Sequence, residues 1–151
     1  LLEEGSEDMI KDIYTLANKT GCEIHLPTGV VLNDEQSLSL DRLSNQNQFS
    51  ILDISDHSIG VLEQLVQRSE IVLWNGPMGM IEDPRFAQGS SKLAHLLANS
   101  SCDVVIGGGD TLLAINIAGV SFDHYHFVST AGGAFLEALE DKELPGIIAL
   151  Q

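Results

Sequence analysis

Three glycine-rich corners, each placed directly after a short apolar run, most constrain how this chain can fold. We number them in chain order: the first corner is Asn75-Gly76-Pro77-Met78-Gly79, the second is Gly107-Gly108-Gly109-Asp110-Thr111, and the third is Ala131-Gly132-Gly133. A helical pattern follows the second corner directly, at residues 112–115. Glycine at such a position allows a positive φ and lets a ligand approach the backbone closely. The corners predict several parallel strands that deliver their loops to one edge of a sheet.

Composition limits the class of protein and of ligand. The chain has 151 residues, of which 44% are hydrophobic, which is typical of one globular domain with a real core. Its net charge of −15 comes from 22 acidic and 7 basic residues, so no nucleic-acid partner is expected. An anionic ligand would instead depend on backbone amides, a metal ion or cations from outside the chain.

Other classes of site and location receive no support from the sequence. No apolar run approaches the roughly 20 residues of a membrane span, so no membrane partner is expected. Cys22 and Cys102 match no metal-binding or redox spacing and are expected to be free thiols. The start at Leu1, without a signal-peptide pattern, suggests the inside of a longer chain.

The apolar spacing alternates between helix and strand along the chain. Five helices are predicted. The first covers 6–20, the second follows a cap at Ser55, Asp56 or Ser58, and the third begins at the Asp83-Pro84 cap. The fourth begins at Asp110, and the fifth runs through Phe135 to about Asp141. Strands are predicted over 22–26, 49–54, 71–74, 103–106 and 125–128, with 71–74 buried on both faces. Residues 28–48 are expected to form an exposed loop, and Pro145-Gly146 a turn. The alternation predicts an α/β fold: a parallel sheet with helices on both faces.

The second corner offers two kinds of chemistry. It lacks the closing Gly-Lys-[Ser/Thr] of a P-loop, and the chain contains no G-x-G-x-x-G fingerprint. Asp110 is either a helix N-cap or, in addition, a contact to Mg²⁺, which proteins hold with one or two carboxylates plus phosphate oxygens. Thr111 is a helix-start residue, a hydroxyl donor to a phosphate, or both.

The other two corners leave similar alternatives. Asn75 belongs to a plain tight turn or donates its amide to a phosphate oxygen. Glu82 is a solvated loop acid or accepts hydrogen bonds from ribose hydroxyls. Gly132 and Gly133 form a turn that caps a helix, or a nest of N–H groups around a transferring phosphoryl group.

The three corners together resemble the phosphoglycerate kinase family. The segments that carry the resemblance are Val72-Leu73-Trp74-Asn75-Gly76-Pro77-Met78-Gly79, Ile106-Gly107-Gly108-Gly109-Asp110-Thr111 and Val128-Ser129-Thr130-Ala131-Gly132-Gly133-Ala134. The resemblance implies reversible phosphoryl transfer between 1,3-bisphosphoglycerate and MgADP, which gives 3-phosphoglycerate and MgATP, in the cytoplasm. It also implies that residues 1–151 are part of a Rossmann-like, three-layer, C-terminal nucleotide-binding domain. By this resemblance, three parts of the family's fold would be absent from the chain: the N-terminal domain that binds 3-phosphoglycerate, the hinge, and two neighbouring strands. The parent protein would usually be monomeric.

Roles carried over from the family fall on eight residues. ADP or ATP with Mg²⁺ would be bound by Asn75, Glu82, Gly108, Gly109, Asp110 and Thr111, with Asp110 also serving the metal. Glu82 would meet the ribose. Gly132 and Gly133 would take the catalytic role beside the moving phosphoryl group.

Several positions depart from the family pattern. Ala131 replaces a glycine, Phe135 a frequent serine, Ser55-Asp56 a usual Gly-Pro, and Ile51 a small residue near the adenine side. Without the two missing strands, residues 1–30 are expected to dock abnormally or to pair with another chain. The chain alone is expected not to turn over. Two alternatives stay open: a non-catalytic nucleotide- or anion-binding module, and a structural remnant that binds nothing.

Overall fold

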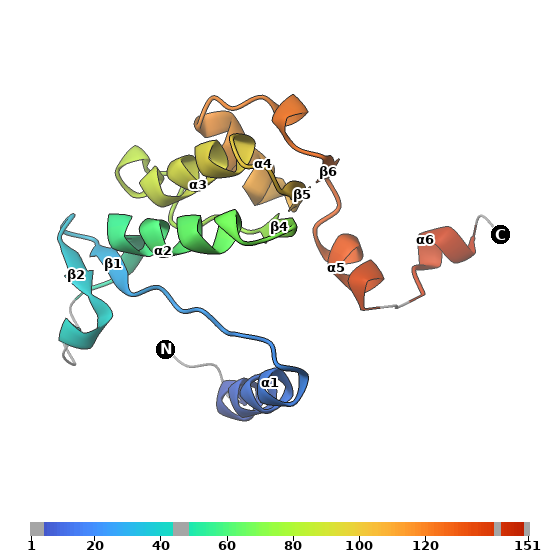
Figure 1. Ribbon diagram of the computed structural model, residues 1–151, viewed down its shortest axis with the longest axis horizontal. Helices are drawn as coiled ribbons and strands as arrows, with labels where there is room; N and C mark the ends of the chain where they lie inside the picture. Colours follow the sequence, from blue (N-terminus) through green and yellow to red (C-terminus); the bar gives the residue numbers. More distant parts are fainter. Residues whose placement is uncertain (1–4, 44–48, 141–142, 150–151) are drawn as a thin grey trace.

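The structure is a computed structural model that describes residues 5–43, 49–140 and 143–149. Its strands form two three-stranded sheets, an antiparallel one in the order β2-β1-β3 and a parallel one in the order β4-β5-β6 (Figure 1). The strands are β1 Gly29–Leu32, β2 Ser37–Ser39, β3 Ile51–Ile54, β4 Ile71–Asn75, β5 Asp103–Gly107 and β6 Phe127–Ser129. The α-helices are α1 Ser6–Thr20, α2 Asp56–Gln67, α3 Gln88–Ala98, α4 Gly109–Ile117, α5 Gly133–Leu139 and α6 Pro145–Ile148.

The parallel sheet and its flanking helices confirm the predicted fold class. Helix α3 packs against both α2 and α4. The core joins Trp74 and Ile106 of the strands to Leu97 of α3 and Ile115 of α4. The buried indole is also satisfied, because Trp74 Nε1 donates to Gly76 O at 2.7 Å. These contacts hold the carboxyl ends of the parallel strands in one place.

The expectation that residues 71–74 are buried on both faces was wrong. Ile71 is 66% exposed and Leu73 42% exposed, whereas Trp74 is buried. The reason is that α2, α3 and α4 all contribute to the core on the Trp74 side. Helix α5 reaches the opposite side at one point, where the ring of Phe135 lies against Gly107.

Two local boundary predictions were confirmed in outline. Ser55 is the N-cap of α2, and its side chain accepts from Ser58 N. Asp83 accepts from Arg85 N at 3.0 Å, but it begins a short 3₁₀ turn, Pro84–Phe86, that is separate from α3. The expected turn at Pro145-Gly146 is instead the start of the short helix α6.

Two predictions for the N-terminal third were wrong. Residues 28–48 are not simply a loop, since β1 and β2 pair there and Val30 and Leu32 are buried; residues 44–48 lie outside the described part of the chain. Residues 22–26 are extended but belong to no strand, because no described strand lies beside them to pair with. Instead, β1 pairs antiparallel with β3.

The thiol and membrane predictions can also be checked. Cys22 is exposed and Cys102 is buried, and both are free thiols, as predicted. Across the ranges that the structure describes, no helix combines the length and apolar character needed to span a membrane.

Helix α1 leaves its apolar stripe exposed. Figure 1 shows it away from the helices that flank the parallel sheet, joined to β1 by an extended segment. Only Ala17 of this helix is buried, while Met9, Ile13 and Leu16 are 65%, 50% and 61% exposed. Apolar side chains aligned on one helix face and left in water favour association with another surface.

We therefore predict that the isolated chain self-associates through α1, and that light scattering will show species larger than a monomer. Replacing Ile13 with glutamine should shift the chain toward monomer, because it removes apolar area from the stripe. Lys19→Gln is the matched control, and it should leave the distribution unchanged. A clean monomer in which residues 5–30 are well protected from hydrogen exchange would contradict the prediction.

Candidate functional site

The three corners begin in one row across the parallel sheet. Asn75 of β4 pairs with Gly107 of β5, and Gly107 pairs in turn with Ser129 of β6. Parallel strands that are in register bring their carboxyl ends to the same edge, where α/β sheets bind ligands. The structure thus places all three corners at one edge, as the sequence predicted.

The corners also touch one another, and Gly108 is at the centre. A Cβ at Gly108 would lie 2.9 Å from Asn75 Oδ1, so the amide of the first corner lies directly against the second corner. A Cβ at Gly132 would lie 3.6 Å from Gly108 Cα, which brings the third corner to the same place. Residues from three separate loops therefore surround one backbone position.

The second corner leads into α4 without a side-chain cap. Gly108 is the N-cap, with φ 91° and ψ 138°, and no side chain caps the helix start. Asp110 lies in the first turn of α4 and is exposed, so the expectation that it is the N-cap was wrong. The first N–H groups of a helix have no intrahelical partner, and together with the helix dipole they favour an anion.

Thr111 joins two corners. Its hydroxyl accepts a hydrogen bond from Gly76 N at 2.7 Å, and its side chain is fully buried. The sequence suggested a helix-start residue or a hydroxyl donor to a phosphate; the structure shows a tie between the first and second corners. The burial makes this an internal contact of the protein.

The third corner accommodates its alanine without strain. Glu35 is the only non-glycine residue with a positive φ among those described, so Ala131 adopts an ordinary conformation. Its N–H donates to Ser129 Oγ at 3.2 Å. Gly132 is half-buried beside Gly108, and Gly133 is exposed at the start of α5. The substitution therefore does not disturb the corner.

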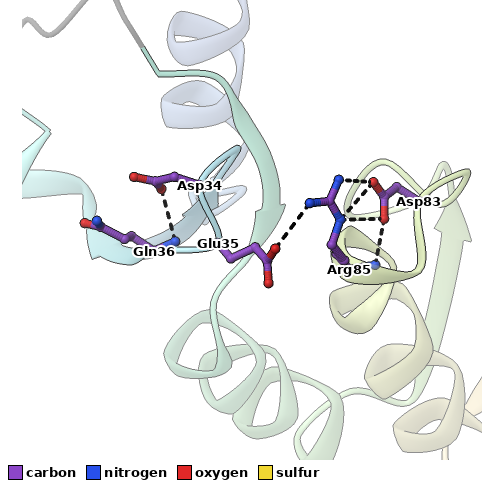
Figure 2. Close-up of polar contacts among 5 residues, drawn as sticks. All are labelled: Asp34, Glu35, Gln36, Asp83 and Arg85. Carbon is purple, nitrogen blue, oxygen red and sulfur yellow. Dashed lines mark hydrogen bonds and ion pairs between the residues drawn. The ribbon is translucent and has the colours of Figure 1, made fainter.

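Glu82 lies on a turn that is anchored by its neighbours. Figure 2 shows Arg85 between Asp83 and Glu35: its guanidinium pairs with Asp83 Oδ2 at 2.6 Å and with Glu35 Oε1 at 3.2 Å. These hydrogen bonds lower the pKa of Asp83 and raise that of Arg85. The pairs connect the turn to the β1–β2 hairpin. Glu82 itself is exposed, and no described contact joins it to the three corners.

An open cavity of about 470 Å³ lies between the first corner and β3. Its lining is mostly apolar and consists of Pro27, Val30, Leu40, Ile51, Leu52, Asp53, Ile54, Pro77, Met78, Gly79 and Met80. Ile51 is 53% exposed. Ile51, which replaces a residue that is usually small in the family, therefore lines a cavity beside the first corner. A mostly apolar cavity with a few polar groups is the usual form of a small-molecule site.

The residues at the corners fit a metal that arrives with a phosphate ligand. Within the described ranges, no three His, Cys, Asp or Glu side chains come together to form a metal cage. Asp110 is a single exposed carboxylate beside the unpaired N–H groups of α4. Mg²⁺ commonly binds through one or two carboxylates together with phosphate oxygens and water. Asp110 is the described residue that would hold it.

Sequence reasoning missed two buried polar residues that lie beside the first corner. Ser90 Oγ accepts from Met78 N at 2.9 Å, and Asp53 accepts from Gly89 N at 2.8 Å. Asp53 had a visible signal, since it is an acidic residue inside the apolar run Ile51-Leu52-Asp53-Ile54. Ser90 had none, because a serine near the start of a helix is commonplace.

Comparison with known proteins decides the family. The phosphoglycerate kinase family model matches residues 1–142. The chain belongs to the phosphoglycerate kinase family. Proteins of this family are kinases, that is, phosphotransferases.

Curated relatives and solved structures agree with the family match. The phosphoglycerate kinase of Zymomonas mobilis is 40% identical over 162 residues, which cover 100% of this chain and 40% of the relative. That of Maricaulis maris is 40% identical, with 99% and 39% covered. The structure of phosphoglycerate kinase from Coxiella burnetii matches with a TM-score of 0.86 and 33% identity, over 99% of this chain and 40% of that one. The chain thus spans about 40% of the length of these relatives.

Proposed function

We propose that this chain supplies the nucleotide-binding part of a phosphoglycerate kinase, which transfers a phosphoryl group reversibly between 1,3-bisphosphoglycerate and MgADP. The observation that carries the proposal is the meeting of three corners around Gly108, at the carboxyl edge of the parallel sheet. Phosphoryl transfer depends mostly on positioning and charge stabilisation, so convergent backbone N–H groups are suitable machinery. Family membership supports the choice of reaction.

Each corner has a proposed task toward the nucleotide. Gly108, Gly109 and Asp110 receive its phosphates at the start of α4, and Asp110 also meets the Mg²⁺ that neutralises phosphate charge. Asn75, whose amide already lies against Gly108, donates to a phosphate oxygen. Thr111 acts from behind by tying the first corner to the second.

The remaining roles follow the family pattern. Gly132 and Gly133 present backbone N–H groups to the phosphoryl group in transfer, and Glu82 accepts from the ribose. The cavity beside the first corner receives the base, with Ile51 in its lining. We propose that this chain is part of a two-domain protein of the cytoplasm. In that protein, 3-phosphoglycerate binds to the domain that lies outside this chain.

We also propose that the chain alone does not turn over. The three corners contain no Lys or Arg, and the chain has only 7 basic residues against 22 acidic ones. A bisphosphorylated substrate needs cations that this surface does not offer. Detectable phosphorylation of 3-phosphoglycerate by the isolated chain would refute this part of the proposal.

Titration calorimetry with MgADP tests the nucleotide site. Weak but measurable binding is expected, and Asp110→Ala should weaken it about tenfold because a charged contact to the metal is lost. Asp12→Ala, which removes the same charge from the exposed surface of α1, is the control and should leave the affinity unchanged. Two outcomes would overturn the proposal: no measurable MgADP binding by the wild type, or the same MgADP affinity in Asp110→Ala and Asp12→Ala. Binding without any role in turnover, once the rest of the family's chain is supplied, would favour a non-catalytic nucleotide-binding module.

A further inference from the structure

Asp53 is an unusual residue for the middle of a strand. It lies in β3, is 2% exposed, and is the one charged side chain among the residues that the structure describes as buried. Taking a carboxylate out of water is costly unless hydrogen bonds replace the lost solvation. A buried carboxylate at this position therefore needs specific hydrogen-bond donors.

Backbone N–H groups provide those partners. Asp53 Oδ1 accepts from Ile54 N and Oδ2 accepts from Gly89 N, both at 2.8 Å. Gly89 is the second residue of α3, so the carboxylate of a strand caps this helix from outside. The two oxygens thus join β3 to the start of α3.

The carboxylate also fills the space beside two glycines. A Cβ at Gly79, in the first corner, would lie 2.5 Å from Asp53 Oδ1. A Cβ at Gly89 would lie 2.4 Å from the same oxygen. Neither distance is possible for real atoms, so the first corner and α3 can close on Asp53 only because both positions are glycine.

Two further bonds hold the same corner around Asp53. Met80 N donates to Leu52 O at 2.8 Å, and Met78 N donates to Ser90 Oγ at 2.9 Å. The corner is therefore attached to β3 and to α3 on either side of Gly79. Asp53 lies between these attachments and also lines the cavity between β3 and the corner.

We propose that Asp53 is a positioning residue for the nucleotide: it sets the first corner, and Asn75 with it, against β3 and α3. The proposal rests on the proposed function for its nucleotide, but the positioning of the corner does not depend on that function. Asp53 acts through the backbone of Gly89 and through the space that it fills at Gly79. It does not touch the reacting atoms.

The test compares Asp53→Asn with a core variant, Val66→Ala. An asparagine can accept with one of its two terminal atoms, so one backbone N–H then faces an NH₂ group. Val66 is buried in α2, belongs to the main core, and does not line the cavity beside the corner, so Val66→Ala loosens the protein without touching this contact. Hydrogen exchange at the amides of Met78, Met80 and Gly89 should rise about tenfold in Asp53→Asn relative to exchange in β5. In Val66→Ala these amides should change only as much as β5 does.

Binding gives a second reading of the same pair. MgADP affinity should fall about tenfold in Asp53→Asn and stay within about twofold in Val66→Ala. If the wild type binds no MgADP, the proposed function fails, while the exchange measurement still decides the role of Asp53. Exchange and affinity that change equally in the two variants would overturn the positioning role.

Acid titration of the wild type provides a measurement that needs no variant. Burial raises the pKa of Asp53 above its ordinary 3.8. The hydrogen bonds from Gly89, Ile54 and Gln88 and the positive charge of Lys92 on α3 lower the pKa, but burial outweighs them. As pH falls through the raised pKa, the protonated carboxyl presents an O–H to a backbone N–H. The raised pKa means that protonation relieves the burial cost, so Asp53's contribution to folding stability improves as pH falls.

A closed corner that buries Asp53 binds this proton more tightly than an opened corner in which the carboxyl meets water. Exchange at Met78, Met80 and Gly89, corrected for the intrinsic effect of pH, should therefore slow relative to exchange in β5 as pH falls through the raised pKa. A carboxyl that took no part in closing the corner would leave the ratio of corner exchange to β5 exchange unchanged. Corner exchange that tracks β5 across this pH range would contradict the proposal.

Discussion

Replacing Gly108 with alanine is expected to weaken MgADP binding about a hundredfold and to destabilise the fold by about 1–3 kcal/mol. Gly108 has φ 91°, a conformation that residues with a side chain rarely adopt. The added methyl group would also meet Asn75 Oδ1 at 2.9 Å and Thr111 Oγ1 at 3.5 Å. Relief of either contact must move a group of the first corner or of α4. Calorimetric titration and urea unfolding measure the two effects.

The adjacent glycine provides the control for stability. A Cβ at Gly109 would meet nothing within 4 Å, and its φ is not positive. Gly109→Ala should therefore change the free energy of unfolding by no more than about 0.5 kcal/mol. Equal destabilisation by both substitutions would show that the strained conformation of Gly108 is not what the corner requires.

Replacing Thr111 with valine is the second large effect, with an expected loss of about 1–3 kcal/mol in stability and about tenfold in MgADP affinity. Valine keeps the shape of threonine but removes the oxygen that accepts from Gly76 N at 2.7 Å. The N–H of Gly76 is then left without an acceptor in a partly buried position, and the first corner is released from α4. Urea unfolding and titration calorimetry with MgADP are the measurements.

Thr111→Ser separates the hydroxyl from the methyl group. Serine retains the acceptor, so the affinity for MgADP should stay near that of the wild type, with a smaller loss of stability from the missing methyl group. An affinity that falls as far in Thr111→Ser as in Thr111→Val would contradict the role of the hydroxyl. It would point instead to packing of the methyl group in the core.

Features that depend on neighbouring residues in the chain could be predicted well. Helix α1 runs over Ser6–Thr20 and ends at Gly21 with a positive φ, as the apolar spacing and the glycine indicated. Ser55 caps α2 through Ser58 N, three residues away. The convergence of the corners was also predictable, because parallel strands bring their carboxyl ends to one edge.

Features that depend on distant partners were missed or predicted wrongly. Residues 22–26 read as a strand from their composition, but a strand exists only where another strand lies beside it. Leu73 appeared buried because the run around it is apolar, yet no described helix shields it from solvent. Which side of an apolar strand is covered depends on the packing of elements elsewhere in the chain.

The amino-acid sequence by itself determined the alternation of strands and helices from β3 to α5, the glycine corners and the excess of acidic charge, since each arises from residues close together in the chain. Only the tertiary structure decided that Thr111 binds Gly76, that Asp53 lies between Gly79 and Gly89, and that Asn75 rests against Gly108. Those contacts join residues that are 26 to 36 positions apart in the chain. Hydrogen bonding and close packing between such segments depend on how the whole sheet brings them together, which no local pattern encodes.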